Sequence, residues 1–187
     1  LLLLAAWSLA LAEAAVARDI ADIKANCKDG EIVETSGVVS ASFRDSSGNW
    51  STYIQEERRV GIRVNGFGGM EEIRYIFDSD GRTFGLLVET DPNGERCLRY
   101  LPNTPIASIA EGLARPVYMP NSRVGGSGFG LQCGPCGCEG LNNVGLLIRT
   151  SGRVTGVDPE KACFYIDDGA CRDNGSRYRG LMVSYDE

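Results

Sequence analysis

At 187 residues, the chain is long enough for one medium domain or two small ones. Its formal net charge of −6 at pH 7 argues against strong non-specific binding to nucleic acid, because such binding depends on cationic side chains that neutralise phosphates. Histidine is absent, so the chain lacks the commonest general base and the commonest metal ligand.

The first elements in the chain are an apolar run and a short helix. Residues 1–11 read LLLLAAWSLAL, which is shorter than the roughly 20 residues that a membrane helix needs. Residues 12–14 (Ala-Glu-Ala) form a small-x-small cleavage pattern, so we expect residues 1–14 to be the remnant of a signal peptide. A buried N-terminal helix is the alternative. This reading predicts a secreted or cell-surface protein with no membrane span in the mature chain. Residues 15–29 form an N-terminal segment, in which residues 16–26 can make two helical turns.

Five strands are expected after this segment. Residues 31–41 are rich in β-branched side chains and contain Gly37, which predicts a long strand with a bulge or a bend. Residues 50–56 and 60–65 are the next two strands, and residues 71–77 can form a short helix.

The last two strands of this set are predicted to form a hairpin. Residues 84–89 and 95–101 flank Asp91-Pro92-Asn93-Gly94, and the Asn-Gly step favours the turns that hairpins use. Five strands in this order match an OB-fold, a small five-stranded Greek-key barrel, over residues 30–104.

A repeat with a long period predicts a second unit of the same kind. Thr35-Ser36-Gly37 recurs 115 residues later as Thr150-Ser151-Gly152. Tyr53-Ile54-Gln55-Glu56 recurs 112 residues later as Tyr165-Ile166-Asp167-Asp168, and Gly61-Ile62-Arg63-Val64 recurs 119 residues later as Gly180-Leu181-Met182-Val183.

The expected fold is therefore all-β, with two OB-like five-stranded Greek-key barrel units in tandem. The second unit, residues 146–187, has strands at 146–157, 162–167 and 178–185 and is incomplete, because its last two strands are missing. A connector rich in glycine and cysteine, residues 105–145, joins the units.

Three strings carry a resemblance to a known group of proteins: GERCLRY from residue 94, LNNVGLLIRTSGRVT from residue 141 and FYIDDG from residue 164. Over residues 29–187 the chain resembles secreted bacterial proteins with repeated OB-fold-like, nucleic-acid-binding-like domains. The resemblance implies a fold and brings no catalytic residue and no cofactor.

Seven cysteines in an exported chain suggest disulfides, with one thiol left over. Cys163 and Cys171 flank the turn at residues 167–169, so they are candidates for a bridge, and two free buried thiols are the equally open alternative.

The stretch Cys133-Gly-Pro-Cys136-Gly-Cys138 has three interpretations. The Cys-Gly-Pro-Cys string resembles a thioredoxin-type redox pair, but its glycine-rich flanks cannot start the helix that this chemistry needs. Three thiolates could also bind zinc or copper, with Cys27 or Cys97 as a fourth ligand. We expect instead a glycine loop held by a disulfide, and no metal.

Asp167 and Asp168 invite a calcium or two-carboxylate interpretation. Neighbouring residues of a strand point to opposite faces, however, and the following Gly169 indicates a simple turn.

OB-folds bind ligands on the face of their second and third strands. Aromatic and arginine side chains there suit the stacking of single-stranded nucleic acid or sugars. The alternative is that both repeated tyrosines belong to the core. The candidate ligand-binding residues are Tyr53, Gln55, Arg58, Arg63, Tyr165 and Arg179.

The sequence thus predicts an exported, non-enzymatic OB-like module that binds single-stranded nucleic acid, a glycan or a partner protein, without a cofactor. The alternatives are a structural or adhesion repeat of a larger bacterial surface protein, and a thiol or metal site at residues 133–138.

Overall fold

The computed structural model describes residues 16–44, 48–56, 60–66, 85–101, 114–135 and 139–185. The expected signal-peptide remnant, residues 1–14, and the expected helix at 71–77 lie outside these residues. Strands dominate the described parts, so the all-β class is confirmed.

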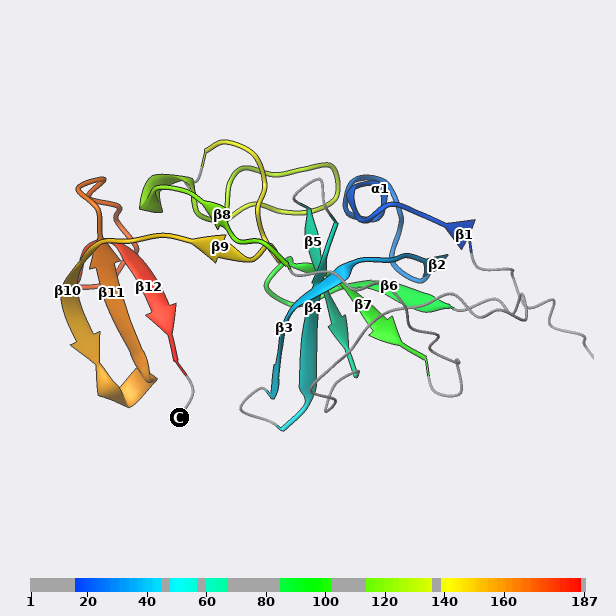
Figure 1. Ribbon diagram of the computed structural model, residues 1–187, viewed down its shortest axis with the longest axis horizontal. Helices are drawn as coiled ribbons and strands as arrows, with labels where there is room; N and C mark the ends of the chain where they lie inside the picture. Colours follow the sequence, from blue (N-terminus) through cyan, green and yellow to red (C-terminus); the bar gives the residue numbers. More distant parts are fainter. Residues whose placement is uncertain are drawn as a thin grey trace, which may run out of the picture.

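The first unit is a seven-stranded mixed sheet with one helix (Figure 1). Its strands follow each other in space in the order β1-β2-β6-β7-β5-β4-β3. Its elements are β1 (Val16–Ala17), α1 (Ile20–Ala25), β2 (Ile32–Glu34), β3 (Val38–Arg44), β4 (Trp50–Gln55), β5 (Gly61–Asn65), β6 (Leu86–Thr90) and β7 (Arg96–Tyr100).

The predicted closed five-stranded barrel is wrong, because the sheet of the first unit is open. The long strand expected at residues 31–41 divides into β2 and β3, which pair with different neighbours: β2 with β6, and β3 with β4. No ladder joins β2 to β3 in the described residues, and β1 covers the other side of β2. Residues 35–37 nevertheless join β2 to β3 along the chain, and these two strands lie at opposite ends of the row β2-β6-β7-β5-β4-β3.

The close approach of β4 to this bend favours a glycine at position 37. A Cβ atom there would lie 3.1 Å from the carbonyl oxygen of Gln55 and 3.2 Å from Cβ of Ile54, which is tighter than ordinary van der Waals contact. Immediately afterwards the β3–β4 register shifts between Val39 and Ala41. The bulge predicted near Gly37 is therefore present.

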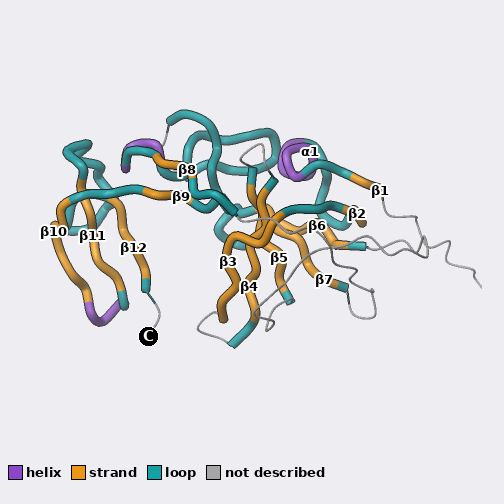
Figure 2. Tube along the Cα trace, in the orientation of Figure 1, coloured by secondary structure: helices purple, strands orange, loops and turns teal. Residues whose placement is uncertain are grey.

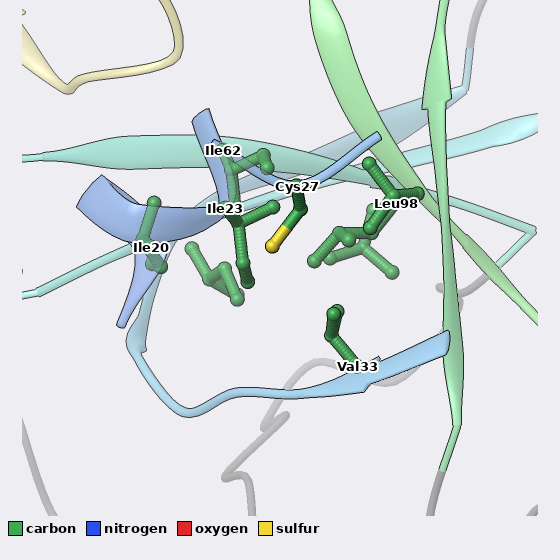
Figure 3. Packing of buried hydrophobic residues seen from close by; sticks show 9 residues of the cluster. Ile20, Ile23, Cys27, Val33, Ile62 and Leu98 are labelled. Carbon is green, nitrogen blue, oxygen red and sulfur yellow. The ribbon is translucent and has the colours of Figure 1, made fainter. Parts of the chain in front are cut away.

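The hydrophobic core of the first unit lies between the sheet and α1 (Figure 3). Ile20 and Ile23 of α1 are fully buried against Val33, Ile62 and Leu98. Each fully buried side chain of this kind contributes about 1.5–3 kcal/mol to stability. The expected N-terminal segment, residues 15–29, is consequently part of the first unit rather than a separate extension.

The second unit consists of a three-stranded antiparallel sheet and a two-stranded parallel ribbon (Figures 1 and 2). The sheet has the order β10-β11-β12, and β8 pairs with β9. The elements are β8 (Val117–Tyr118), η1 (Asn121–Arg123), β9 (Ile148–Arg149), β10 (Arg153–Asp158), η2 (Pro159–Lys161), β11 (Cys163–Asp167) and β12 (Leu181–Ser184).

The bulge of the first long strand occurs again in the second unit. The β10–β11 register shifts between Val154 and Gly156, as the β3–β4 register does between Val39 and Ala41. Both shifts therefore fall at the same place in the sequence repeat.

A hydroxyl group inside each bulge lies near the carbonyl oxygen of the repeated tyrosine. Ser40 Oγ donates to the carbonyl oxygen of Tyr53 at 3.3 Å. Thr155 Oγ1 lies 3.4 Å from the carbonyl oxygen of Tyr165, but it donates its single proton to the closer carbonyl oxygen of Arg179 at 2.6 Å. The two ladders thus share the register shift and the place of the hydroxyl, but not its hydrogen-bond partner.

In both units, an acidic residue that directly follows a strand (β4 or β11) accepts a hydrogen bond from the first backbone amide of a helix (α1 or η1). The amide of Ile20 donates to Oε1 of Glu56, and the amide of Asn121 donates to Oδ2 of Asp168 at 2.8 Å. Helix N-termini carry unpaired N–H groups, so a carboxylate stabilises them. This contact gives the repeated acid a structural role.

The second unit begins earlier than expected. The amide of Arg18 donates to Glu34 O at 2.8 Å as β1 runs beside β2, and the amide of Met119 donates to Arg149 O at 3.1 Å as β8 runs beside β9. The predicted connector, residues 105–145, therefore includes the first strand of the second unit.

One difference between the units yields a matched pair of mutations. Thr150 Oγ1 donates to Oδ1 of Asn121 at 2.6 Å. The equivalent Thr35 Oγ1 is inaccessible to solvent and has no hydrogen-bond partner, because Ile20 occupies the place of Asn121.

We expect Thr150→Val to lower the free energy of unfolding by about 1–3 kcal/mol, because it leaves a buried amide oxygen unsatisfied. Thr35→Val removes a buried hydroxyl that has no partner, so it should leave stability unchanged or raise it. Urea denaturation of the two variants beside the wild type measures both effects. Equal losses would contradict the assignment.

Candidate ligand-binding face

The side chains of β3, β4, β5 and β7 alternate between the core and an outer face. Ile54, Ile62, Val64 and Leu98 point into the core. Because successive strand residues point to opposite sides, their neighbours form the outer face. This face contains Phe43, Tyr53, Arg63, Asn65, Cys97 and Arg99.

Arg63 lies at the centre of this face, and two carboxylates neutralise it. Its Nη2 atom lies 2.5 Å from Oδ2 of Asp91 and 3.2 Å from Oε2 of Glu95. All three side chains are largely shielded from water. The hairpin turn positions Asp91, because its Oδ1 accepts hydrogen bonds from the amides of Asn93 and Glu95.

Tyr53 is the direct cross-strand neighbour of Arg63. Its hydroxyl donates to Glu95, and burial together with that carboxylate raises the pKa of Tyr53 to about 12. The ring of Tyr53 stacks on Phe43, with centroids 6.0 Å apart and planes inclined by 21°. Phe43 is 43% exposed, so the pair presents an aromatic surface to solvent beside a polar cluster.

The electrostatics of this cluster do not favour an anionic ligand. Burial raises the pKa of Glu95, and the nearby Asp91 adds to that effect. The second arginine of the face, Arg99, pairs with Glu89 at 2.7 Å. Each arginine of the face is thus paired with a carboxylate.

A cavity of about 600 Å³ lies beside the face, next to β6 and the turn of the β6–β7 hairpin. Among the described residues, its lining carries several acids and no basic side chain. The polar groups in that lining are Asp29, Asn65, Glu89, Thr90 and Asp91.

Gln55, a predicted ligand-binding residue, has a structural role instead. Its side chain is 6% exposed, and both the nitrogen and the oxygen of its amide form hydrogen bonds with backbone atoms in or just before the second unit. Nε2 donates to Arg115 O, and Oε1 accepts from the amide of Leu147, each at 3.3 Å. Arg58, another predicted residue, lies outside the described residues.

The second unit does not repeat this face. Tyr165 is 3% exposed and packs against Tyr178 with ring centroids 5.1 Å apart, which favours the alternative that this tyrosine belongs to the core. Met182 is the cross-strand neighbour of Tyr165, in the place that Arg63 has in the first unit. Arg179 is exposed and follows Tyr178, and its carbonyl oxygen accepts a hydrogen bond from Thr155 Oγ1 at 2.6 Å.

No family model, curated protein or solved structure matches the chain significantly.

Within the part of the chain that the structure describes, no helix is long and apolar enough to cross a membrane.

The described residues hold no group of three or more metal-ligating side chains. Cys133 is an exposed free thiol, and Cys136 and Cys138 lie outside the described residues. Cys27 and Cys97, considered above as a fourth ligand, are both buried free thiols, and burial raises the pKa of each.

The candidate bridge between Cys163 and Cys171 is not formed, and both residues are free thiols, of which Cys163 is buried and Cys171 is exposed. Cys163 is the first residue of β11, whereas the amide of Cys171 donates to Oδ1 of Asp167, the last residue of that strand, at 2.9 Å. Four strand residues span about 13 Å, which is too far for a disulfide.

The two neighbouring acids of the second unit have separate partners. Asp167 binds the amide of Cys171, and Asp168 binds the amides of Ala170 and Asn121. The structure therefore favours the turn interpretation over a paired-carboxylate site.

Lys24 is a buried charged residue that the sequence analysis missed. It is 2% exposed, and its Nζ donates to Gly61 O at 3.1 Å, Val144 O at 2.7 Å and Asn142 Oδ1 at 3.2 Å. Lys24 thereby fastens the loop before β9 to α1 and β5. Burial lowers the pKa of Lys24 to about 8, and the charge of Glu95 opposes that shift.

The lowered pKa of Lys24 predicts a pH dependence of stability. The folded protein releases this proton near pH 8, whereas an unfolded lysine releases it near 10.5, so unfolding takes up a proton between these values. Raising the pH from 8 to 10.5 should therefore stabilise wild type relative to Lys24→Met, by at most about 1.4 kcal/mol per pH unit. Urea denaturation across this range measures the difference, and a flat or falling difference would contradict it.

Proposed function

We propose that the chain is an exported, non-enzymatic OB-like binding module, and that its ligand is a neutral polymer, a glycan. One observation carries this proposal. The stacked rings of Phe43 and Tyr53 lie beside Arg63, which Asp91 and Glu95 already neutralise. Stacked aromatic surfaces bind the flat faces of ring-shaped ligands, and the neighbouring polar groups can exchange hydrogen bonds with hydroxyl groups.

The strand order supports an OB-like relationship. Counted as one bent strand, β2 and β3 border both ends of the row β6-β7-β5-β4: β2 pairs with β6 at one end, and β3 pairs with β4 at the other. The parallel contact between β5 and β7 fits the same scheme, in which a partly open Greek-key barrel binds its ligand on the second and third strands. In this chain those strands are β4 and β5, which carry Tyr53 and Arg63.

The charge of the face favours a glycan over single-stranded nucleic acid. Nucleic-acid binding releases counterions when cationic side chains neutralise phosphates. Arg63 and Arg99 are both engaged by carboxylates, and the chain as a whole carries a charge of −6 at pH 7. A polyanion would have to displace these carboxylates, whereas a neutral sugar would not.

Export is part of the proposal because of the apolar run at residues 1–11 and the cleavage pattern that follows it. The second unit carries Met182 in the place of Arg63, so we assign ligand binding to the first unit alone.

A panel of neutral polysaccharides, followed by calorimetry on any that bind, tests the proposal. We expect Phe43→Ala to weaken binding about tenfold, because it removes the exposed half of the aromatic pair. Tyr118→Ala is the matched control, since Tyr118 is 68% exposed on β8 and should not affect affinity.

Single-stranded DNA and RNA provide the opposing arm of this experiment. Wild type should bind them weakly, and Asp91→Asn with Glu95→Gln should strengthen that binding by freeing Arg63. Tight, salt-dependent binding of nucleic acid by the wild type, with no response to polysaccharides, would overturn the glycan assignment.

A further inference from the structure

The cavity beside β6 and the aromatic pair lie on the same face of the first sheet. β4, β5, β7 and β6 follow each other in that sheet (Figure 1). The register places Asn65 of β5 opposite Arg99 of β7, and Arg99 opposite Leu87 of β6. In the other direction, Asn65 lies opposite Ser51 of β4, which lies opposite Phe43 of β3. One row of side chains therefore crosses the whole face from Phe43 to Leu87.

This row ends in the cavity. Asn65 and Leu87 are among the residues that line it, and so are Glu89 and Cys97, a cross-strand pair of the neighbouring row. Strands in a sheet lie about 4.8 Å apart, so the three spacings between β3 and β7 separate Phe43 from the cavity by about 14 Å along the sheet. A ligand that reaches both places must therefore be an extended chain.

The cavity offers both apolar surface and room for a small ring. Leu87, Pro92 and Cys97 supply apolar atoms to its lining. Its volume of about 600 Å³ lies within the usual range of small-molecule sites, which combine such surface with a few polar groups.

The polar groups of the cavity have acceptors to spare, whereas their donors are engaged. Thr90 Oγ1 donates to Oδ1 of Asp29 at 2.9 Å, and Nδ2 of Asn65 donates to Sγ of Cys97 at 3.5 Å. Among the described residues, Oδ2 of Asp29 and Oε2 of Glu89 have no hydrogen-bond partner. The hydroxyl groups of a sugar can donate to these oxygens, whereas an ionised carboxylate on the ligand has no proton to donate and meets like charge.

We propose that the cavity is a second subsite of the glycan-binding face, and that the ligand is a linear oligosaccharide of neutral units, with uronic acids excluded. One sugar unit stacks on Phe43, and another lies in the cavity, where its hydroxyl groups donate to Asp29 and Glu89. The cavity thus adds a length requirement and a charge selectivity to the proposed function, on which this assignment rests.

Chain length tests the second subsite. Calorimetry compares cellohexaose with cellobiose, and mannohexaose with mannobiose. For a backbone that binds, the hexasaccharide should bind at least about tenfold more tightly than the disaccharide, because only the longer chain reaches both subsites.

Leu87→Trp is the variant that fills the cavity, and it lies four strands away from Phe43 in the sheet. It should lower the affinity for the hexasaccharide about tenfold and leave the affinity for the disaccharide unchanged. Leu87→Met conserves the volume of the side chain and is the matched control. If urea denaturation shows that Leu87→Trp does not fold, the charge variants below provide the test.

Charge tests the selectivity. The wild type should bind the hexamers of glucuronate and mannuronate at least about tenfold more weakly than the neutral hexasaccharides with the same backbone. Asp29→Asn with Glu89→Gln removes two charges and keeps the acceptor oxygens, so it should strengthen uronate binding about tenfold and change neutral binding little. Glu139→Gln with Glu160→Gln removes the same charge at exposed positions elsewhere and should change neither.

Any of three results would overturn the second subsite: equal affinity for disaccharide and hexasaccharide, equal affinity for neutral and uronate hexamers, or full hexasaccharide affinity in folded Leu87→Trp. Each leaves the proposed glycan site intact if Phe43→Ala still weakens disaccharide binding. If neither neutral hexasaccharide binds, the second subsite is also wrong, and the response to the polysaccharide panel decides the proposed function separately.

Discussion

The interruption of the first long strand at residues 35–37 is the constraint on which the first unit depends. Because the strand bends there, one continuous stretch of chain pairs with β6 through β2 and with β4 through β3. The bend favours a residue without a side chain, since the backbone of Gln55 lies close to Gly37. The two pairings fix where the hairpin, the helix and the core must lie, and Val33, Ile54 and Val88 are buried as a result.

Carboxylates and one ammonium group connect the remaining parts to this framework. Glu56 holds the start of α1 against the end of β4, and Asp168 holds the start of η1 against the end of β11. Lys24 holds the loop before β9, where Gly61 and Gly145 approach so closely that a Cβ atom on Gly61 would lie 2.1 Å from Gly145 O. Buried polar groups of this kind are stable because each finds partners, and they specify one arrangement of the loop.

Much of the fold could be predicted from local sequence signals. Each strand longer than two residues coincides with a run that β-branched and aromatic residues had indicated, and the Asn93-Gly94 step forms the predicted turn, with Gly94 at a φ of +82°. The register of the second unit agrees with the repeat, since the glycine and the tyrosine of each copy occupy matching positions in the β3–β4 and β10–β11 ladders. The two-residue strands β1 and β8 escaped prediction because they are too short to show a period.

The roles of individual side chains were less predictable, because they depend on distant partners. Tyr53 and Tyr165 occupy the same position in the repeat, yet one lies beside Arg63 and the other beneath Tyr178. Gln55 and Lys24 look like surface residues in the sequence, and the backbone atoms that bury them belong to the second unit and its preceding loop. No local pattern encodes such contacts.

The lengths of the loops between paired strands also bear on the order in which the chain folds. The β10–β11–β12 meander joins strands that are neighbours in the sequence, with Pro159–Lys161 inside the first connection. The first unit must instead bring Ile32 to Leu87 and Arg63 to Cys97 before its sheet is complete. Closing such long loops costs chain entropy before any contact forms, so topology alone gives the meander the lower kinetic barrier.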